Sequence, residues 1–98
     1  MFHYLVKEDE FLPVKEVDEE GLKALNSEIR RKILEKASEK RVSIEDLTED
    51  LDVKEQAVYY HVEDMMDSGL LDATDGRPRY FGAENSAFYF RPDFVESE

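Results

Sequence analysis

Apolar residues recur at helical spacing through the middle of the chain. Ile29, Ile33, Leu34 and Ala37 fall on one face of a helix, and the charged residues between them fall outside that face. Asn26 precedes this run and is a residue type that caps helix N-termini. The pattern therefore predicts an amphipathic helix that begins after Asn26 and buries one face.

Two shorter helices are expected on either side of it. Asp18, followed by acidic residues in the first turn, predicts a helix over residues 19–25. Ser43 opens a capping-box pattern, in which its hydroxyl caps the helix and the Asp46 carboxylate accepts a bond from the Ser43 amide. This box predicts a helix over residues 44–51.

A longer helix follows the tight turn at residues 51–53. Val58, Val62 and Met65 repeat at intervals of four and three residues, which places them on one helix face. Gly69 is the residue type that commonly ends helices. These positions predict a helix of about four turns between the turn and Gly69.

The pattern then changes to that of strands. Residues 70–74 and 79–83 flank a turn at residues 75–78 and predict a β-hairpin. A further aromatic run covers residues 87–90. At the other end of the chain the residues up to 17 alternate only weakly, and Pro13 is expected to confine any strand there to a sheet edge, because proline donates no hydrogen bond.

The order of these elements predicts an α+β fold that is mostly α. The helix after Asn26, the helix over residues 44–51 and the longer helix that ends at Gly69 are followed by a hairpin. This order predicts a winged helix-turn-helix: a three-helix core with a β-hairpin wing and flanking strand segments. We expect a single domain over residues 1–98, with an N-terminal arm at 1–17, the core and wing at 26–83, and a C-terminal strand and acidic tail at 84–98.

The composition excludes several function classes. The chain has no cysteine and only 2 histidines, so we expect no disulfide, metal or other cofactor. We expect no membrane span and a cytoplasmic location, since no apolar run of about 18 residues occurs. No nucleophile motif or phosphate-binding glycine loop is present, so we expect a protein that is not an enzyme. His61 is expected to pack against the core or to form a helix-capping bond, and not to act as a pH sensor or metal ligand.

The charge points away from a typical nucleic-acid-binding domain. With 25 acidic and 13 basic residues the formal net charge is -12, whereas such domains are usually basic. One explanation is a cytoplasm of very high salt, where the Debye length shrinks to roughly 3 Å at 1 M and repulsion from phosphates is muted. The other is a protein partner with a basic face.

Three segments carry a family resemblance: A-L-N-S-E-I-R-R-K-I-L, V-S-I-E-D-L-T-E-D-L-D-V and A-V-Y-Y-H-V-E-D-M-M-D-S-G-L-L. They resemble the arsenical-repressor (ArsR) type of winged helix. The later segment R-Y-F-G-A-E-N-S-A-F-Y-F is similar to a branch of that family common in archaea. The resemblance covers roughly residues 14–90 and implies a dimeric transcriptional regulator that binds double-stranded DNA.

The resemblance also implies which residues meet DNA. It places the last predicted helix, which ends at Gly69, in the major groove, and we call it the recognition helix. Its exposed residues are Lys54, Glu55, Gln56, Tyr59 and Tyr60. The Gln56 amide can pair with an adenine edge, and the tyrosines can reach phosphates or pack on sugars. Without a DNA role, the two tyrosines would simply cover neighbouring apolar surface.

Basic residues outside the recognition helix are the other candidates for DNA contacts. Arg77 and Arg79 flank the tip of the wing, where the family touches the DNA backbone or minor groove. Lys40 and Arg41, before the second of the two short helices, are further candidates for phosphate contacts. The alternative for the wing arginines is a solvated turn with ion pairs to nearby acidic residues. Those residues are Asp72 and Asp75.

The sequence departs from the family in three ways. Lys54 stands where the family has a capping serine or threonine, and losing that cap costs about 1 kcal/mol. Residues 54–67 carry one positive and four negative side chains, which opposes entry into a groove lined by phosphates. The cysteines and paired ligands of the metal-sensing members are missing, so metal sensing is not expected.

Aromatic residues at the two ends of the chain exceed what a minimal winged helix needs. They are Phe2, Tyr4, Phe11, Phe88, Tyr89 and Phe90. Such clusters indicate either a dimer surface or end segments that pair as strands against the same domain.

Two functions follow from the sequence: a homodimeric DNA-binding regulator, or an acidic winged-helix module that binds a protein and not DNA.

Overall fold

The structure is a computed structural model that describes residues 3–7, 10–85 and 87–91, with side chains from residue 14 onward. The helices are α1 (Glu19–Leu25), α2 (Glu28–Glu39), α3 (Ile44–Leu51) and α4 (Glu55–Asp67). The strands are β1 (His3–Lys7), β2 (Glu10–Glu16), β3 (Asp72–Ala73), β4 (Phe81–Gly82) and β5 (Ala87–Tyr89). The fold is therefore α+β and mostly helical, as the sequence predicts.

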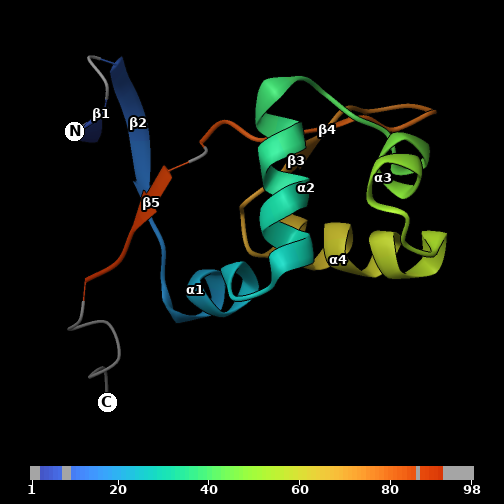
Figure 1. Ribbon diagram of the computed structural model, residues 1–98, viewed down its shortest axis with the longest axis horizontal. Coiled ribbons are helices and arrows are strands. Elements are labelled where there is room, and N and C mark those ends of the chain that lie inside the picture. The colour runs from blue at the N-terminus through green and yellow to red at the C-terminus, as the bar shows by residue number, and fades with distance from the viewer. Residues whose placement is uncertain (1–2, 8–9, 86, 92–98) are drawn as a thin grey trace.

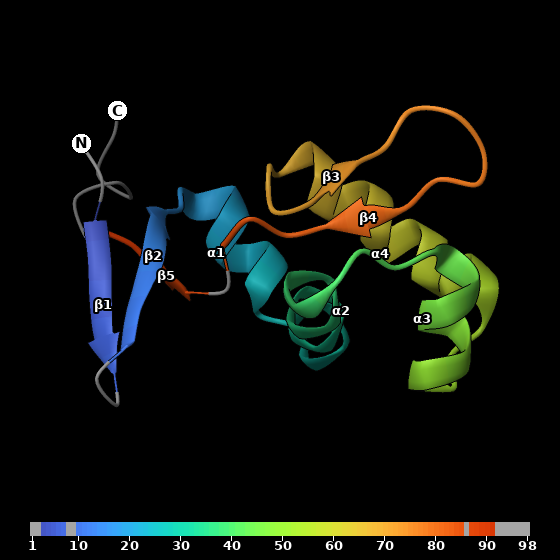
Figure 2. The same ribbon diagram turned by 90° about the horizontal axis from the view of Figure 1, so that it is seen from above.

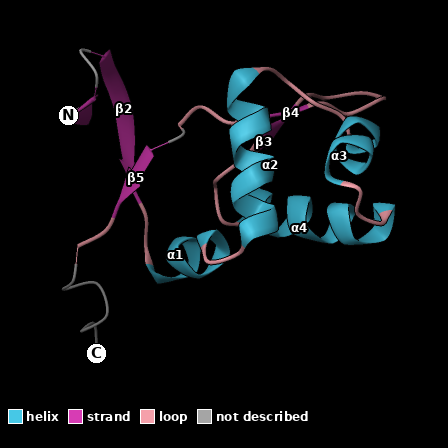
Figure 3. Ribbon diagram, viewed as in Figure 1, coloured by secondary structure: helices cyan, strands magenta, loops and turns pink. Residues whose placement is uncertain are grey.

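The molecule has two ends of different construction. Helices α2, α3 and α4 and the wing strands β3 and β4 pack together at one end, and the sheet of β1, β2 and β5 lies at the other (Figure 1). The view from above shows the same separation, with α1 and α2 between the sheet and α3 (Figure 2). Colouring by secondary structure shows that helices make up most of the first of these ends (Figure 3).

The core lies where the helices meet the wing. Val58, Val62 and Met65 are buried along one face of α4, as their spacing predicts, and Ile33 is buried on the facing side of α2. The most deeply buried side chains are Ile33, Val42, Leu47, Val58, Val62, Met65 and Phe81. Each large apolar side chain fully removed from water stabilises the fold by roughly 1.5–3 kcal/mol. This cluster therefore fixes α4 relative to α2, α3 and the wing.

The predicted start of the central helix is wrong by one residue. Asn26 is the C-cap of α1, and the N-cap of α2 is Ser27, whose Oγ accepts a bond of 3.3 Å from the Arg30 amide. Two helices with a short link compete for the residues between them, and the backbone N–H of Asn26 is already bonded to the Lys23 carbonyl. The range predicted for α1 is confirmed, including the Asp18 cap.

The two helices of the helix-turn-helix begin differently. At α3 the predicted capping box is present, with the Ser43 hydroxyl bonded to the Asp46 amide and the Asp46 carboxylate bonded to the Ser43 amide, both at 3.1 Å. The turn passes through Asp52, which is left-handed at φ 52°. At α4, Lys54 occupies the N-cap position and makes no side-chain capping bond. The missing cap expected from the sequence is therefore confirmed.

The wing is shorter than predicted. Residues 70 and 71 do not belong to a strand: Leu70 and Leu71 are buried in the core directly after α4. Pairing is limited to Asp72 with Gly82 and Ala73 with Phe81. The other edge of β4 bonds to the link between α2 and α3, through Val42 N–H to Phe81 O at 2.9 Å and Phe81 N–H to Val42 O at 2.7 Å. This link acts as a third short strand of the wing.

The prediction that Pro13 lies in an edge strand is wrong, because β2 is the middle strand of its sheet. It pairs antiparallel with β1, with Tyr4 opposite Pro13, and parallel with β5 over Val14 to Glu16 only. Proline is tolerated since the pairing with β5 starts one residue later. The two end segments of the chain therefore do pair as strands. Of the aromatic residues named above, Phe2 lies outside the described residues, and the side chains of Tyr4 and Phe11 are not described.

No helix in residues 3–7, 10–85 and 87–91 has the length and apolar character needed to cross a bilayer.

Candidate nucleic-acid interface

One face of α4 is open to solvent and carries polar and aromatic side chains. Tyr59 is 51% exposed and Tyr60 64% exposed, and Gln56 lies exposed one turn before them. Burial of the opposite apolar stripe of α4 turns this face outward. The structure therefore brings together the candidate residues of α4, with Lys54 exposed at the start of the helix.

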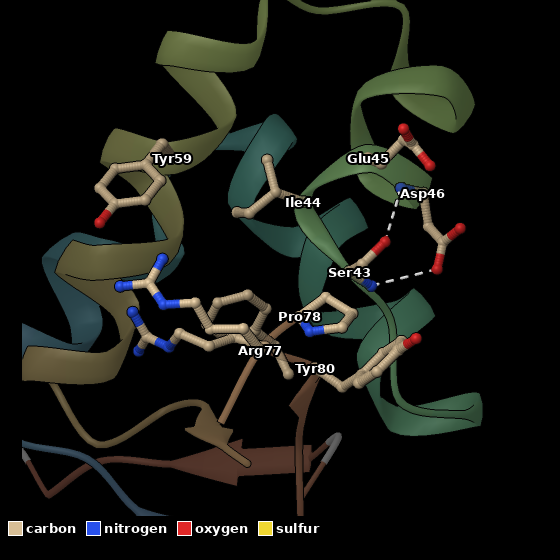
Figure 4. Close-up of a pocket in the computed structure, with 10 residues that line it drawn as sticks. Ser43, Ile44, Glu45, Asp46, Tyr59, Arg77, Pro78 and Tyr80 are labelled. Atoms are coloured by element: carbon tan, nitrogen blue, oxygen red, sulfur yellow. Dashed lines mark hydrogen bonds between the residues drawn. The ribbon is translucent and has the colours of Figure 1, made fainter. Parts of the chain in front are cut away.

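A groove of about 430 Å³ separates the wing from α3 and α4. Figure 4 shows Tyr59 of α4 and Arg77 of the wing on one side, and Glu45 and Asp46 of α3 on the other. Its remaining lining consists of Ser43, Ile44, Pro78, Arg79, Tyr80 and Phe81. We call this side of α4, with Tyr59, Glu63, Arg77 and Arg79, the wing flank.

The two wing arginines have different surroundings. Arg77 is exposed, and within the described part of the chain it forms no hydrogen bond or ion pair. Arg79 is half-buried against α4, where it contacts Glu63 Oε2 at 3.3 Å and Met66 Sδ at 3.3 Å and lies 5.1 Å from the Phe81 ring centre. Arg77 is therefore available to a phosphate, while the guanidinium of Arg79 binds the wing to α4.

The alternative interpretation, in which the wing arginines pair with Asp72 or Asp75, does not match the observed ion pairs. Neither pairs with an acidic residue of the turn: Asp72 pairs with Arg41, and Arg79 with Glu63. Arg41 also donates to the Tyr80 carbonyl at 3.5 Å, so it ties the link before α3 to the base of the wing. Its predicted role at phosphates would compete with these bonds. Lys40, by contrast, is exposed at the end of α2.

The other side of α4 faces α2, and we call it the α2 flank: Arg30, Tyr60, His61 and Asp64. Arg30 Nε donates to His61 Nδ1 at 2.9 Å, and its Nη1 forms an ion pair with Asp64. The guanidinium lies 5.7 Å from the centre of the Tyr60 ring, and its side chain is only 11% exposed. Burial, with a smaller contribution from the adjacent Arg30 charge, lowers the pKa of His61 from its ordinary value of 6.5, while Asp64 acts in the opposite direction.

The packing role expected for His61 is thus joined by a specific hydrogen bond. Sequence analysis missed its partner, Arg30, which had been grouped with the charged residues outside the buried face of α2. A signal was available, since Arg30 directly follows Ile29 at the margin of that face, from which a long side chain reaches the next helix.

These contacts change the electrostatics of α4. Glu63 and Asp64 each pair with an arginine from another element, which leaves Glu55 and Asp67 without such a partner among the described residues. The net charge of -3 over residues 54–67 is therefore compensated in part, on the C-terminal side of the two tyrosines. The exposed side of α3 stays acidic, through Glu45, Asp46 and Glu49, whereas Asp50 pairs with Lys36 at 3.7 Å.

Metal binding receives no support from the described side chains, among which no group of three histidine or acidic residues is arranged to hold an ion.

Comparison with known families gives one match, to the PCI domain, over residues 6–74. This range includes all four helices and the start of the wing. A search of curated proteins found no match.

Two solved structures share the fold. One is an ArsR-like transcriptional regulator from Rhodococcus sp. RHA1, with 28% sequence identity and a TM-score of 0.60, covering 65% of this chain. This chain spans 61% of the length of that regulator. The other is Rv0081 of M. tuberculosis, with 23% identity and a TM-score of 0.61, covering 79% of this chain and 73% of that one. The predicted winged-helix fold is confirmed by these likenesses. The archaeal branch suggested by the sequence has no support, since both neighbours are bacterial.

Proposed function

We propose that this chain, which belongs to the PCI domain family, is a regulator that binds double-stranded DNA, because its winged-helix fold resembles that of an ArsR-like transcriptional regulator. In this proposal two copies form a symmetric dimer in the cytoplasm and place their α4 helices in successive major grooves, roughly 34 Å apart. The protein has no catalytic role and no cofactor.

The observation that carries the proposal is the exposed face of α4 beside an unpaired wing arginine. Gln56, Tyr59 and Tyr60 project from the helix, and Arg77 lies across the groove from α3 on the same side as Tyr59. A glutamine amide can read an adenine edge, and the tyrosine hydroxyls and guanidinium suit phosphates. A surface evolved only to cover apolar residues has no use for a free arginine at this place.

The pairing of acidic residues on α4 supports the same function. A helix in the major groove sits between two rows of phosphates, so each unpaired carboxylate weakens its binding. Arg30 and Arg79 neutralise Asp64 and Glu63, which lie one turn after Tyr60 and Tyr59. Near this surface the remaining acidic residues are Glu55 and those of α3, and a cytoplasm of high salt would screen them.

The second candidate function is a module that binds a basic protein partner. Two observations favour it: the PCI match, which is to a protein-interaction domain, and the exposed acidic side of α3. In that case the groove beside the wing would hold a basic segment near Glu45 and Asp46.

Selection from a pool of random-sequence duplex DNA, from low to molar salt, separates the two functions. We expect enrichment of one palindromic site and a dimer by light scattering. The Gln56→Ala variant should then lose roughly 1–3 kcal/mol of preference for the selected site, while Arg77→Ala weakens all sequences alike. Failure to bind any duplex at any salt would contradict the DNA-binding function and favour the protein partner.

A further inference from the structure

The contacts of Arg30 make the α2 flank more than a surface ion pair. Three groups of α4 meet one guanidinium: the His61 ring nitrogen at 2.9 Å, the Asp64 carboxylate and the face of the Tyr60 ring. Tyr60 and His61 also touch each other edge to face, with ring centres 5.5 Å apart. The guanidinium is planar and its N–H groups are fixed in direction, so these contacts define one another's geometry.

The direction of the bond to His61 defines the state of the imidazole. The Arg30 Nε–H donates, so His61 Nδ1 must be unprotonated and the neutral ring carries its proton on Nε2. A protonated ring has N–H groups on both nitrogens and cannot accept this bond. It would also place a positive charge beside Arg30 and offer Asp64 a competing partner.

Resting on the function proposed above, we propose that Arg30 is a positioning residue for the DNA-facing surface of α4, and that it makes DNA binding depend on neutral His61. Arg30 sets the direction of the Tyr60 ring and neutralises Asp64, while the bond to His61 Nδ1 fixes the guanidinium between them. Protonation of His61 breaks that bond, draws Asp64 away from Arg30 and releases the Tyr60 ring from its position.

The groups that act on the imidazole are few. They are Arg30 from α2, which opposes protonation, and Asp64 from α4 itself, which favours it. Of the described residues of the other elements packed on α4, namely α1, α3 and the wing, none contributes a charge that acts on His61. The response of His61 to acid therefore depends on its burial and on these two charges.

The first test uses the free protein, without DNA. Nitrogen-15 NMR of the His61 ring should show an unprotonated Nδ1 at neutral pH and a pKa below the ordinary value. In Arg30→Met the preference for this tautomer should disappear and the pKa should rise. The matched control is Arg31→Met on the same helix, since Arg31 is exposed and bonds only to the Leu25 carbonyl at 2.7 Å within the described residues. An unchanged His61 ring in Arg30→Met would overturn the positioning role.

The second test measures the affinity for random-sequence duplex DNA at about pH 7.5 and about pH 5.5 by fluorescence anisotropy, across the range in which histidine titrates. His61→Asn is the key variant, because its side-chain oxygen can accept from Arg30 and does not titrate. We expect the affinity of the wild type to fall on acidification relative to that of His61→Asn. Identical pH profiles of the two proteins would overturn the dependence on neutral His61.

Arg30→Met should bind about tenfold more weakly than Arg31→Met at the higher pH, which corresponds to about 1.4 kcal/mol. Circular dichroism of each variant separates this loss from unfolding, and His61→Asn keeps the test valid if Arg30→Met does not fold. Should none of the proteins bind DNA, the proposed function and the dependence of DNA binding on His61 both fail. The NMR result then still decides whether Arg30 positions the α2 flank.

Discussion

The two flanks of α4 use the same chemistry with different burial. On the α2 flank the Arg30 side chain is 11% exposed and contacts three groups of α4, while its partner Asp64 is 44% exposed. On the wing flank Arg79 pairs with Glu63 at side-chain exposures of 35% and 39%, next to a groove open to solvent. The carboxylates of the two pairs are similarly exposed, so the flanks differ in the burial of their arginines, and removing a contact of the buried arginine costs more because water does not replace it.

This difference separates a rigid side of the helix from an adjustable one. The α2 flank fixes the position and rotation of α4, since its arginine comes from a helix whose own apolar face is buried in the core. The wing flank holds a short hairpin with a free arginine, which can adapt to a ligand with little loss of other contacts.

The largest effect is expected from Arg30→Met. The change removes the partner of Asp64 and the donor to His61 while keeping most of the apolar volume, so the free energy of unfolding should fall by roughly 1–3 kcal/mol. Urea denaturation followed by circular dichroism measures this. Arg31→Met serves as the control and should change the stability little; equal losses in the two variants would contradict the rigid α2 flank.

A smaller loss is expected from Arg79→Met. Its ion pair with Glu63 is partly exposed, and such pairs contribute about 0.2–1 kcal/mol, with a similar amount from its contact with the Phe81 ring. The same denaturation experiment should rank this variant between Arg30→Met and the wild type. A loss larger than that of Arg30→Met would reverse the order of the two flanks.

Acid should weaken the α2 flank in particular. The pKa of His61 is lowered in the folded protein, so the unfolded chain binds more protons, and stability rises with pH in this range. The contribution of neutral His61 is complete above pH 6.5, the ordinary value, and is lost as the pH falls through the lower folded pKa. Thermal unfolding of wild type and His61→Asn between these limits should show the difference; parallel curves would exclude it.

The smallest effect on stability is expected from Arg77→Ala. This residue is exposed and has no partner among the described residues, so its removal should change the free energy of unfolding by less than about 0.5 kcal/mol. Denaturation of the variant measures this directly. A clear loss would mean that Arg77 is part of the framework, as Arg79 is.

Local patterns were enough to predict the helices. The capping box at Ser43 and the repeat of Val58, Val62 and Met65 depend on neighbours in the sequence, and α3 and α4 have the predicted positions. The wing was less predictable, because Phe81 pairs on its second edge with Val42, far away in the sequence. The middle position of β2 depends likewise on pairing with the distant β5.

The candidate site likewise has residues whose exposure the sequence predicts and residues whose contacts depend on the fold. Exposure of Gln56, Tyr59 and Tyr60 follows from the periodicity of α4, and the structure agrees with it. The different surroundings of Arg77 and Arg79 could not be read from the sequence, since they depend on how the wing folds onto α4. Arg30 was missed for the same reason: its partners lie on another helix.

The most direct test of the central claim is the salt dependence of binding to random-sequence duplex DNA, measured for the wild type, Arg77→Ala and Arg31→Ala. Each phosphate contact contributes about 0.9 to the slope of log affinity against log salt concentration. We predict that Arg77→Ala lowers this slope by about 1 and weakens binding, while Arg31→Ala, on the side of α2 away from α4, leaves both unchanged. Equal slopes for all three proteins, or no binding by any of them, would contradict the assignment of α4 and the wing as a DNA-binding surface.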